Sequence, residues 1–225
     1  MRLGVIVPTF RDSLVDALEV ANDCETRGLD GVFAYDHLWP MGSPSRASFA
    51  PFPVLAAVAA RCPTLHVGPL VARVGMVGAA HLIEQFRSLA SIAPGRVIAA
   101  LGTGDTKSRD ELEAYGLNFA SPAQRRAEVE LVARAVSDEM PVWIGAGAEA
   151  TNELARRLGV TLNLWDAEVD RLQRQSLIGP VTWAGPAREN VGAHLDQLRA
   201  AGVQWAVFGP GVDLDELANW RERGE

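Results

Sequence analysis

The chain has 225 residues, of which 48% are hydrophobic and 22% charged, and its formal net charge at pH 7 is −7. This length suffices for one domain, expected to span residues 1–225, with a sizeable buried core. The negative charge argues against nucleic-acid or anionic-membrane partners, because both require clustered cations. We recognise neither a signal peptide nor an apolar run of transmembrane length, so we expect a cytoplasmic protein.

Short apolar runs alternate with amphipathic stretches along the whole chain. Each run is too short for a helix and rich in Val, Ile, Leu or Trp, which is typical of strands buried on both faces. The predicted strands span residues 3–7, 31–35, 65–71, 97–101, 142–145, 160–164, 181–184 and 205–209. Eight strands alternating with helices predict an α/β fold, a compact (β/α)8 TIM barrel, with an open doubly wound sheet as the alternative.

The stretches between the strands carry helix signals of their own. The stretch 12–27 repeats apolar side chains at spacings of three and four, and Gly28 then supplies a typical helix end. Ser121 is followed directly by a proline and, three residues on, by Gln124. This pattern predicts an N-cap and capping box for a helix that runs to about residue 137.

The residues Asp36 and His37 directly follow the second predicted strand. Alternating β/α folds place their chemistry at the carboxyl ends of the strands. His37 could act as a general acid or base, because imidazole titrates near neutral pH. Asp36 could orient the imidazole or bind a cofactor ring. The alternative, that His37 only caps a loop through a hydrogen bond, stays open at this point.

Two glycine-containing turns follow the fourth and fifth predicted strands. They are Gly102-Thr103-Gly104 and Gly145-Ala146-Gly147. Such turns let backbone N–H groups approach an anion at a helix N-terminus, although βα loops also use glycine for geometry alone. Asp105, next in the chain, could be a proton donor if it is buried. Its alternative role is the N-cap of a helix that begins near Lys107.

No metal or redox site is predicted. Cys24 and Cys62 do not form a CxxC motif, and no two histidines have a spacing suited to a metal. Four tryptophans fall near predicted strand ends, where they could stack on a flat ring or belong to the core: Trp39, Trp165, Trp183 and Trp205. We expect the first three to lie near the site.

Several motifs, taken in chain order, resemble the bacterial luciferase-like flavin monooxygenases, and especially their branch of oxidoreductases that use the deazaflavin F420. The matching segments are Pro8-Thr9-Phe10, Gly28-Leu29-Asp30-Gly31-Val32-Phe33, Asp36-His37-Leu38, Leu65-His66-Val67-Gly68, Gly95-Arg96, Leu101-Gly102-Thr103-Gly104-Asp105, 111–116, Arg125, Glu130, Gly185-Pro186 and Ala201-Gly202-Val203. The resemblance spans the chain, and residues 1–130 carry most of it.

This resemblance implies a (β/α)8 barrel that binds F420, or alternatively FMN, at the carboxyl ends of its strands. It implies proton transfer by His37, ring contact by Asp36 and a second acid at Asp105. It also implies a bulge with a non-prolyl cis peptide against the ring, near Leu70-Val71-Ala72, and a phosphate near the turn from Gly145 to Ala148.

The chain is shorter than a typical member of that family, and the loss falls between about residues 164 and 179. With Lys107 as the only lysine, phosphate binding would rest on arginines and backbone N–H groups. The predicted function is F420-dependent hydride transfer to or from a small organic substrate, in a possible homodimer. The alternatives are an FMN-dependent monooxygenase and a non-catalytic flavin-binding or partner protein of the same fold. A sugar-phosphate isomerase or metal-dependent lyase lacks support, because no cluster of carboxylates and histidines falls at the strand ends.

Overall fold

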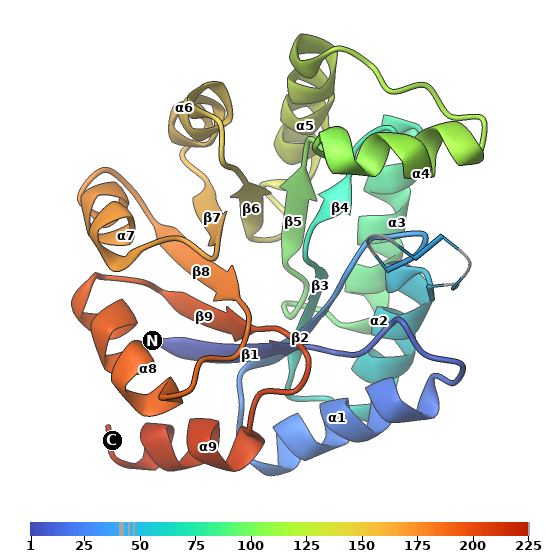
Figure 1. Cartoon of the computed structure of the whole chain (residues 1–225). Coiled ribbons are helices and arrows are strands. Elements are labelled where there is room, and N and C mark those ends of the chain that lie inside the picture. The colour runs from blue at the N-terminus through green and yellow to red at the C-terminus, as the bar shows by residue number, and fades with distance from the viewer. Residues whose placement is uncertain (41–42, 45, 47, 225) are drawn as a thin grey trace.

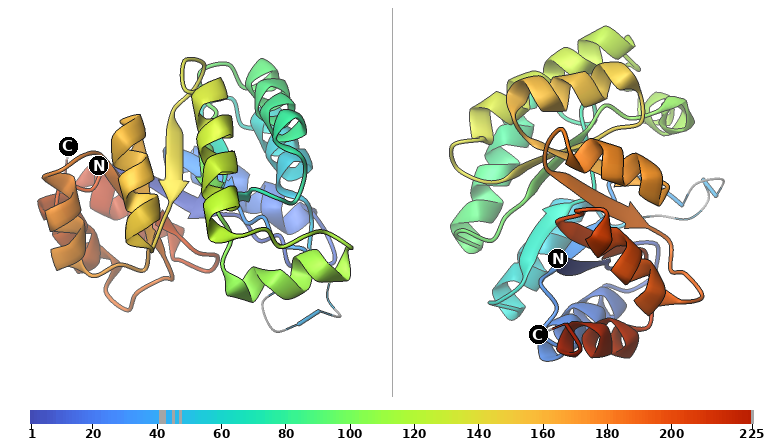
Figure 2. Two further views of the ribbon diagram at one scale, coloured as in Figure 1. Left: turned by 90° about the horizontal axis from the view of Figure 1, so that it is seen from above. Right: turned by 90° about the vertical axis from the view of Figure 1, so that its left-hand side faces the viewer.

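The computed structural model describes residues 1–40, 43–44, 46 and 48–224. Its parallel strands form one sheet in the order β3-β2-β1-β9-β8-β7-β6-β5-β4, surrounded by helices (Figures 1 and 2). The strands are β1 Arg2–Ile6, β2 Gly31–Ala34, β3 His66–Pro69, β4 Ala72–Arg73, β5 Ala99–Gly102, β6 Val142–Gly145, β7 Thr161–Trp165, β8 Val181–Gly185 and β9 Trp205–Phe208. This nearly closed parallel barrel confirms the predicted α/β barrel.

The third predicted strand is the one that the structure changes. The predicted strand 65–71 corresponds to β3, which ends at Pro69, and Leu70 and Val71 separate β3 from β4, which was not predicted. The peptide bond between Leu70 and Val71 is cis, where the resemblance implied it. β3 pairs with β2, whereas β4 pairs with β5. A bridge between Val67 and Val97 joins the two ends of the sheet, so the barrel closes at this interrupted strand.

The helices form the outer layer. They are α1 Val15–Thr26, α2 Pro51–Arg61, α3 Ala79–Ile92, α4 Arg109–Ala114, α5 Pro122–Val136, α6 Glu149–Leu158, α7 Val169–Ser176, α8 Val191–Ala200 and α9 Leu214–Glu222, with a 3-10 helix η1 at Thr106–Ser108. The capping box at Ser121 and Gln124 is present as predicted. The helix predicted from residue 12 begins at Val15, and Gly28 follows it with φ 69°. None of the described helices is long and apolar enough to cross a lipid bilayer.

The interior of the barrel is filled by large side chains. Phe33, Trp143 and Trp205 meet there, with ring centroids 5.3–5.8 Å apart. Trp183, in contrast, points outward and packs against His194 of α8, with ring centroids 4.7 Å apart. The expectation that Trp183 lies near the site is therefore wrong. Because side chains alternate between the faces of a strand, β8 presents Ala184 and not Trp183 to the barrel interior.

Candidate active site

A cavity of about 690 Å³ lies at the carboxyl ends of the strands. Its volume falls in the range of small-molecule and cofactor sites. Its lining residues are Phe10, Tyr35, Asp36, His37, Leu70, Val71, Arg73, Gly102, Thr103, Gly104, Asp105, Ser108, Gly145, Ala146, Gly147, Ala148, Thr151, Asn163, Trp165 and Arg171. All the predicted site residues are brought together here except Ala72, which is buried in the outer core. Their contact with a cofactor stays a prediction.

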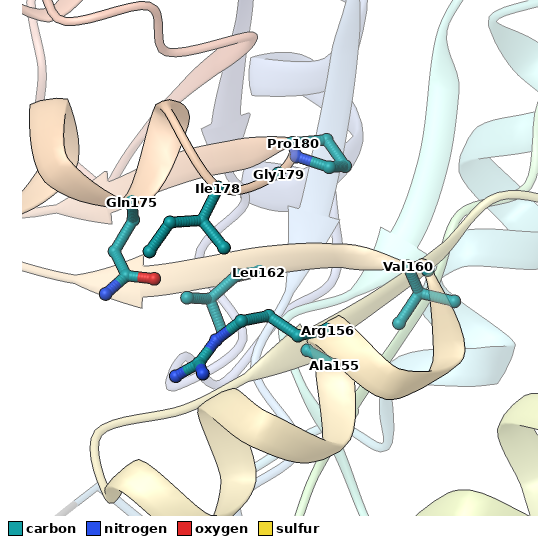
Figure 3. Close-up of a pocket in the computed structure, with 9 residues that line it drawn as sticks. Ala155, Arg156, Val160, Leu162, Gln175, Ile178, Gly179 and Pro180 are labelled. Carbon is teal, nitrogen blue, oxygen red and sulfur yellow. The ribbon is translucent and has the colours of Figure 1, made fainter.

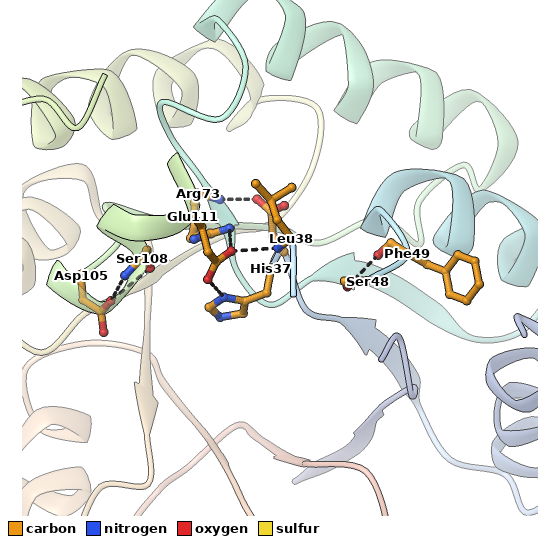
Figure 4. A network of polar contacts seen from close by, with 9 residues as sticks. His37, Leu38, Ser48, Phe49, Arg73, Asp105, Ser108 and Glu111 are labelled. Atoms are coloured by element: carbon orange, nitrogen blue, oxygen red, sulfur yellow. Dashed lines mark hydrogen bonds and ion pairs between the residues drawn. The ribbon is translucent and has the colours of Figure 1, made fainter. Parts of the chain in front are cut away.

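His37 is held by a carboxylate that comes from a distant part of the chain (Figure 4). Its Nδ1 lies 2.7 Å from Oε1 of Glu111, on α4. The carboxylate accepts the Nδ1 proton, so Nε2 is the ring atom left for a ligand in the cavity. Sequence reasoning left open whether His37 only caps a loop through a hydrogen bond. The bond to Glu111 instead orients the imidazole toward the cavity.

Glu111 is 1% exposed and ties three segments together. Its Oε2 accepts hydrogen bonds from the backbone N–H of Leu38 and from Nη2 of Arg73, each at 2.8 Å. Burial by itself raises the pKa of the Glu111 carboxyl, but Leu38, His37 and Arg73 together hold it below its ordinary value. The Glu111 carboxylate is thus ionised and fully engaged at neutral pH.

Asp36 is anchored on the other side of the same network. Its Oδ2 accepts the backbone N–H of Arg73 at 2.8 Å, which links the end of β2 to β4. Burial raises the pKa of the Asp36 carboxyl, and the N–H and charge of Arg73 oppose that rise. Arg73 therefore donates hydrogen bonds to both carboxylates: its backbone N–H to Asp36 and its guanidinium to Glu111.

Sequence reasoning missed the roles of Glu111 and Arg73. In the sequence Arg73 follows the third predicted strand, and Glu111 begins the segment 111–116 that resembles the family. The sequence carries no local signal for Glu111, because α4 has three acidic residues and only the structure shows that Glu111 is the buried one.

Asp105 has the capping role that was its alternative. It is exposed, and its Oδ1 accepts the N–H and the hydroxyl of Ser108, each at 3.1 Å, at the start of η1. Its carboxylate lines the cavity. The role of second acid stays a prediction.

The floor of the cavity is formed by the side chain of Val71, which lies over two glycines. A Cβ atom at Gly102 would lie 2.4 Å from Val71 Cγ2, and one at Gly145 would lie 2.9 Å from Val71 Cγ1. The two glycines are paired neighbours in β5 and β6. Their missing side chains are what lets the interrupted third strand place an apolar surface at the barrel mouth.

Replacing Gly102 by Ala should therefore destabilise the protein by about 1–3 kcal/mol, because Val71 must move to accommodate the new methyl group. Chemical denaturation measures this. Gly147→Ala is the matched control, because a Cβ there meets nothing within 4 Å. The double change Gly102→Ala with Val71→Ala should recover much of the loss, and a Gly102→Ala protein as stable as the wild type would contradict the packing described.

The turn 145–148 leads into the N-terminus of α6, which has no side-chain cap. Unsatisfied N–H groups at a helix N-terminus attract anions. Arg171 of α7 lines the cavity beside this turn, and its Nη2 donates to the carbonyl of Gly147 at 3.3 Å. These groups suit the phosphate of a flavin or deazaflavin, and the apolar floor at Val71 suits its ring.

A smaller cavity of about 130 Å³ lies between α6, α7 and the start of β7 (Figure 3). Apolar residues and glycines make up most of its lining. Arg156, the charged residue in it, forms ion pairs with Glu149 and Glu153. Gln175 is the other polar side chain of the described lining, which contains no His, Cys, Asp or Glu.

Of the tryptophans expected near the site, Trp165 lines the large cavity and Trp39 does not. Trp165 is 50% exposed. Trp39 instead contacts Tyr115, with ring centroids 6.2 Å apart. Trp165 is therefore the one of the three expected tryptophans that can report on a ligand in the cavity.

The sequence of the chain is similar to that of a protein of known activity. The chain is 26% identical over 210 residues to the F420-dependent glucose-6-phosphate dehydrogenase of Nakamurella multipartita, over 80% of this chain and 60% of that protein. The chain thus spans about 60% of the length of this relative.

Solved structures show the same fold. One is an F420-dependent secondary alcohol dehydrogenase in complex with an F420-acetone adduct, with a TM-score of 0.81 and 14% identity over 97% of both chains. Another is the coenzyme F420-dependent tetrahydromethanopterin reductase of Methanopyrus kandleri, with a TM-score of 0.76 and 11% identity over 97% of this chain and 96% of that one.

The family itself is given by a sequence match. The family described as Luciferase-like monooxygenase matches residues 1–140, which is more than half of the 225 residues. That stretch contains Asp36, which follows β2, Arg73 at the end of β4, and the helix α4 that carries Glu111. The protein belongs to the luciferase-like monooxygenase family.

Proposed function

We propose that the protein is an oxidoreductase that uses the deazaflavin F420 for hydride transfer to or from a small organic substrate, with FMN as the alternative cofactor. The observation that carries this proposal is the His37–Glu111 contact at the edge of a 690 Å³ cavity. It presents one oriented imidazole nitrogen to any ligand bound there. The F420-dependent relatives support the choice of deazaflavin.

The bound cofactor would supply the carbon or nitrogen atom that gives or takes the hydride. The chain's own residues provide position and proton transfer. Val71 supports the flat ring, and Arg171 with the N-terminus of α6 holds the phosphate. His37 Nε2 gives a proton to the substrate oxygen, or takes one from it, while Glu111 keeps the ring in place.

Titration of the purified protein with F420 and, separately, with FMN tests this proposal. The fluorescence of Trp165 should be quenched as the cofactor fills the cavity. We expect F420 to bind at least about tenfold more tightly than FMN. In Trp165→Leu the quenching should shrink while calorimetry still detects the binding. If neither cofactor binds, the proposal fails.

The second candidate is a non-catalytic protein of the same fold that binds a flavin or a partner. The observation that favours it is the short connection between β7 and α7, residues 166–168, which leaves Trp165 half-exposed. A cavity that stays open to water weakens every electrostatic interaction inside it. Cofactor binding without turnover on any substrate would favour this candidate.

A further inference from the structure

Three aromatic side chains form a wall across the mouth of the barrel. This aromatic wall consists of Phe10, Tyr35 and Trp165. Phe10 stacks on Tyr35, with ring centroids 5.7 Å apart and planes 9° apart, and Tyr35 contacts Trp165 at 6.0 Å. Tyr35 follows β2 and Trp165 ends β7, and the strands β1, β9 and β8 lie between them in the sheet. The Tyr35–Trp165 contact therefore crosses the barrel mouth.

The wall limits the cavity on one side and faces His37. None of the described lining residues belongs to the loops after β8 or β9, which lie behind the wall. The His37 ring lies 6.3 Å from that of Tyr35 and 6.5 Å from that of Phe10. A molecule that reaches His37 Nε2 thus has aromatic surface beside it, half-exposed in the case of Trp165.

The arginine of the described lining that shares Glu111 with His37 is buried and ion-paired. The guanidinium of Arg73 is 4% exposed and paired with Glu111 at 2.8 Å. Burial raises the pKa of Tyr35 to about 12, so its hydroxyl stays neutral. Arg171 is the other arginine of the described lining; it lies on α7, which follows Trp165 of β7, whereas His37 follows β2 across the barrel. An anion at the His37 end of the wall would lose its hydration without gaining Arg171 as a partner.

We infer that the substrate is a neutral molecule with a planar ring or conjugated carbonyl, which stacks on the aromatic wall beside His37, and that phosphorylated substrates are excluded. This inference rests on the function proposed above and specifies its substrate class. Aromatic rings favour planar, weakly hydrated partners, because stacking adds to the gain from burying apolar surface. Arg171, the arginine of the described lining that has no ion pair among the described residues, lies where the cofactor phosphate is expected.

Calorimetric titration with 2-naphthol and 2-naphthyl phosphate tests the inference, because the two probes share a ring and differ in the phosphate. The protein is first saturated with whichever cofactor binds it. We expect 2-naphthol to bind at least about tenfold more tightly than 2-naphthyl phosphate. Trp165→Leu should weaken binding of 2-naphthol by about tenfold. Tyr115→Leu is the control, because this exposed aromatic residue does not line the cavity.

Each outcome has a defined meaning. Equal or tighter binding of the phosphate, no binding of 2-naphthol, or unchanged affinity in Trp165→Leu would overturn the inference. If neither F420 nor FMN binds, the titrations are made on the protein alone. Discrimination between the probes would then preserve the ligand class while the proposed function fails. If a cofactor binds and the protein prefers 2-naphthyl phosphate, the proposed function survives and the inferred substrate class fails.

Discussion

Replacement of His37 by alanine should lower turnover by about 10²–10⁴-fold, the usual contribution of a positioned general acid or base. The structure gives the reason, because Nδ1 of His37 is bound to Glu111 and Nε2 remains for the reacting molecule. The fold should persist, since Glu111 keeps its bonds to Leu38 and Arg73. The change in cofactor absorbance during turnover measures the effect.

His81→Ala is the matched control for this prediction. His81 is an exposed residue of α3, outside the cavity, so its loss should leave turnover unchanged. Thermal unfolding of both variants separates a catalytic defect from a folding defect. Full activity of a folded His37→Ala protein would remove His37 from the mechanism and favour the second acid, Asp105.

Replacement of Glu111 by alanine should destabilise the protein by about 3–5 kcal/mol, the usual cost of leaving one member of a buried ion pair without its partner. Arg73 is 4% exposed, and its Nε and Nη1 have no hydrogen-bond partner, so its charge depends on Glu111. The variant should also lose turnover, because the His37 ring is then free to rotate. Urea denaturation measures the first effect.

Two further variants sharpen the Glu111 prediction. Glu113→Ala changes an exposed carboxylate of the same helix and should cost less than about 0.5 kcal/mol. Arg73→Met combined with Glu111→Leu should recover a large part of the stability, since it removes the charge and its partner together. A loss below about 1 kcal/mol in Glu111→Ala would show that the pair contributes little.

The acid sensitivity of the fold should follow the same residue. The folded-state pKa of Glu111 lies below its ordinary value, so the ionised carboxylate stabilises the fold above that ordinary value. This stabilisation is lost as the pH falls through the lowered value. Asp36, whose pKa is raised, contributes to the pH dependence of stability with the opposite sign. The charge of Glu111 is one cause of the raised pKa of Asp36, so the difference between wild type and Glu111→Ala, followed against pH, reports Glu111 together with its effect on Asp36.

The local elements were readable from the sequence because local interactions form them. The capping box of α5 depends on Ser121 and Gln124, three residues apart, and both lie in the sequence pattern. The strands were recognisable as short apolar runs, and their boundaries differ from those observed by a few residues. The site could be placed at the strand ends because parallel strands bring their carboxyl ends to one side.

The contacts within the site could not be read in the same way. Glu111 lies 74 residues from His37 and 38 from Arg73, and no local pattern encodes a pairing across such distances. The direction of Trp183 likewise depends on which face of β8 meets the barrel interior. The register of the closed sheet decides that face, and a shift of one residue would reverse it.

The sequence by itself determined the alternation of strands and helices, the position of Asp36 and His37 at a strand end, and the membership in a family of barrel proteins. Periodicity, caps and glycine turns are short-range properties, so they survive in a linear reading. Only the tertiary structure decided that Glu111 orients His37, that Val71 lies over Gly102 and Gly145, and that Tyr35 meets Trp165 across the barrel mouth. These contacts exist because closure of the sheet brings together distant strand ends and the segments that follow them.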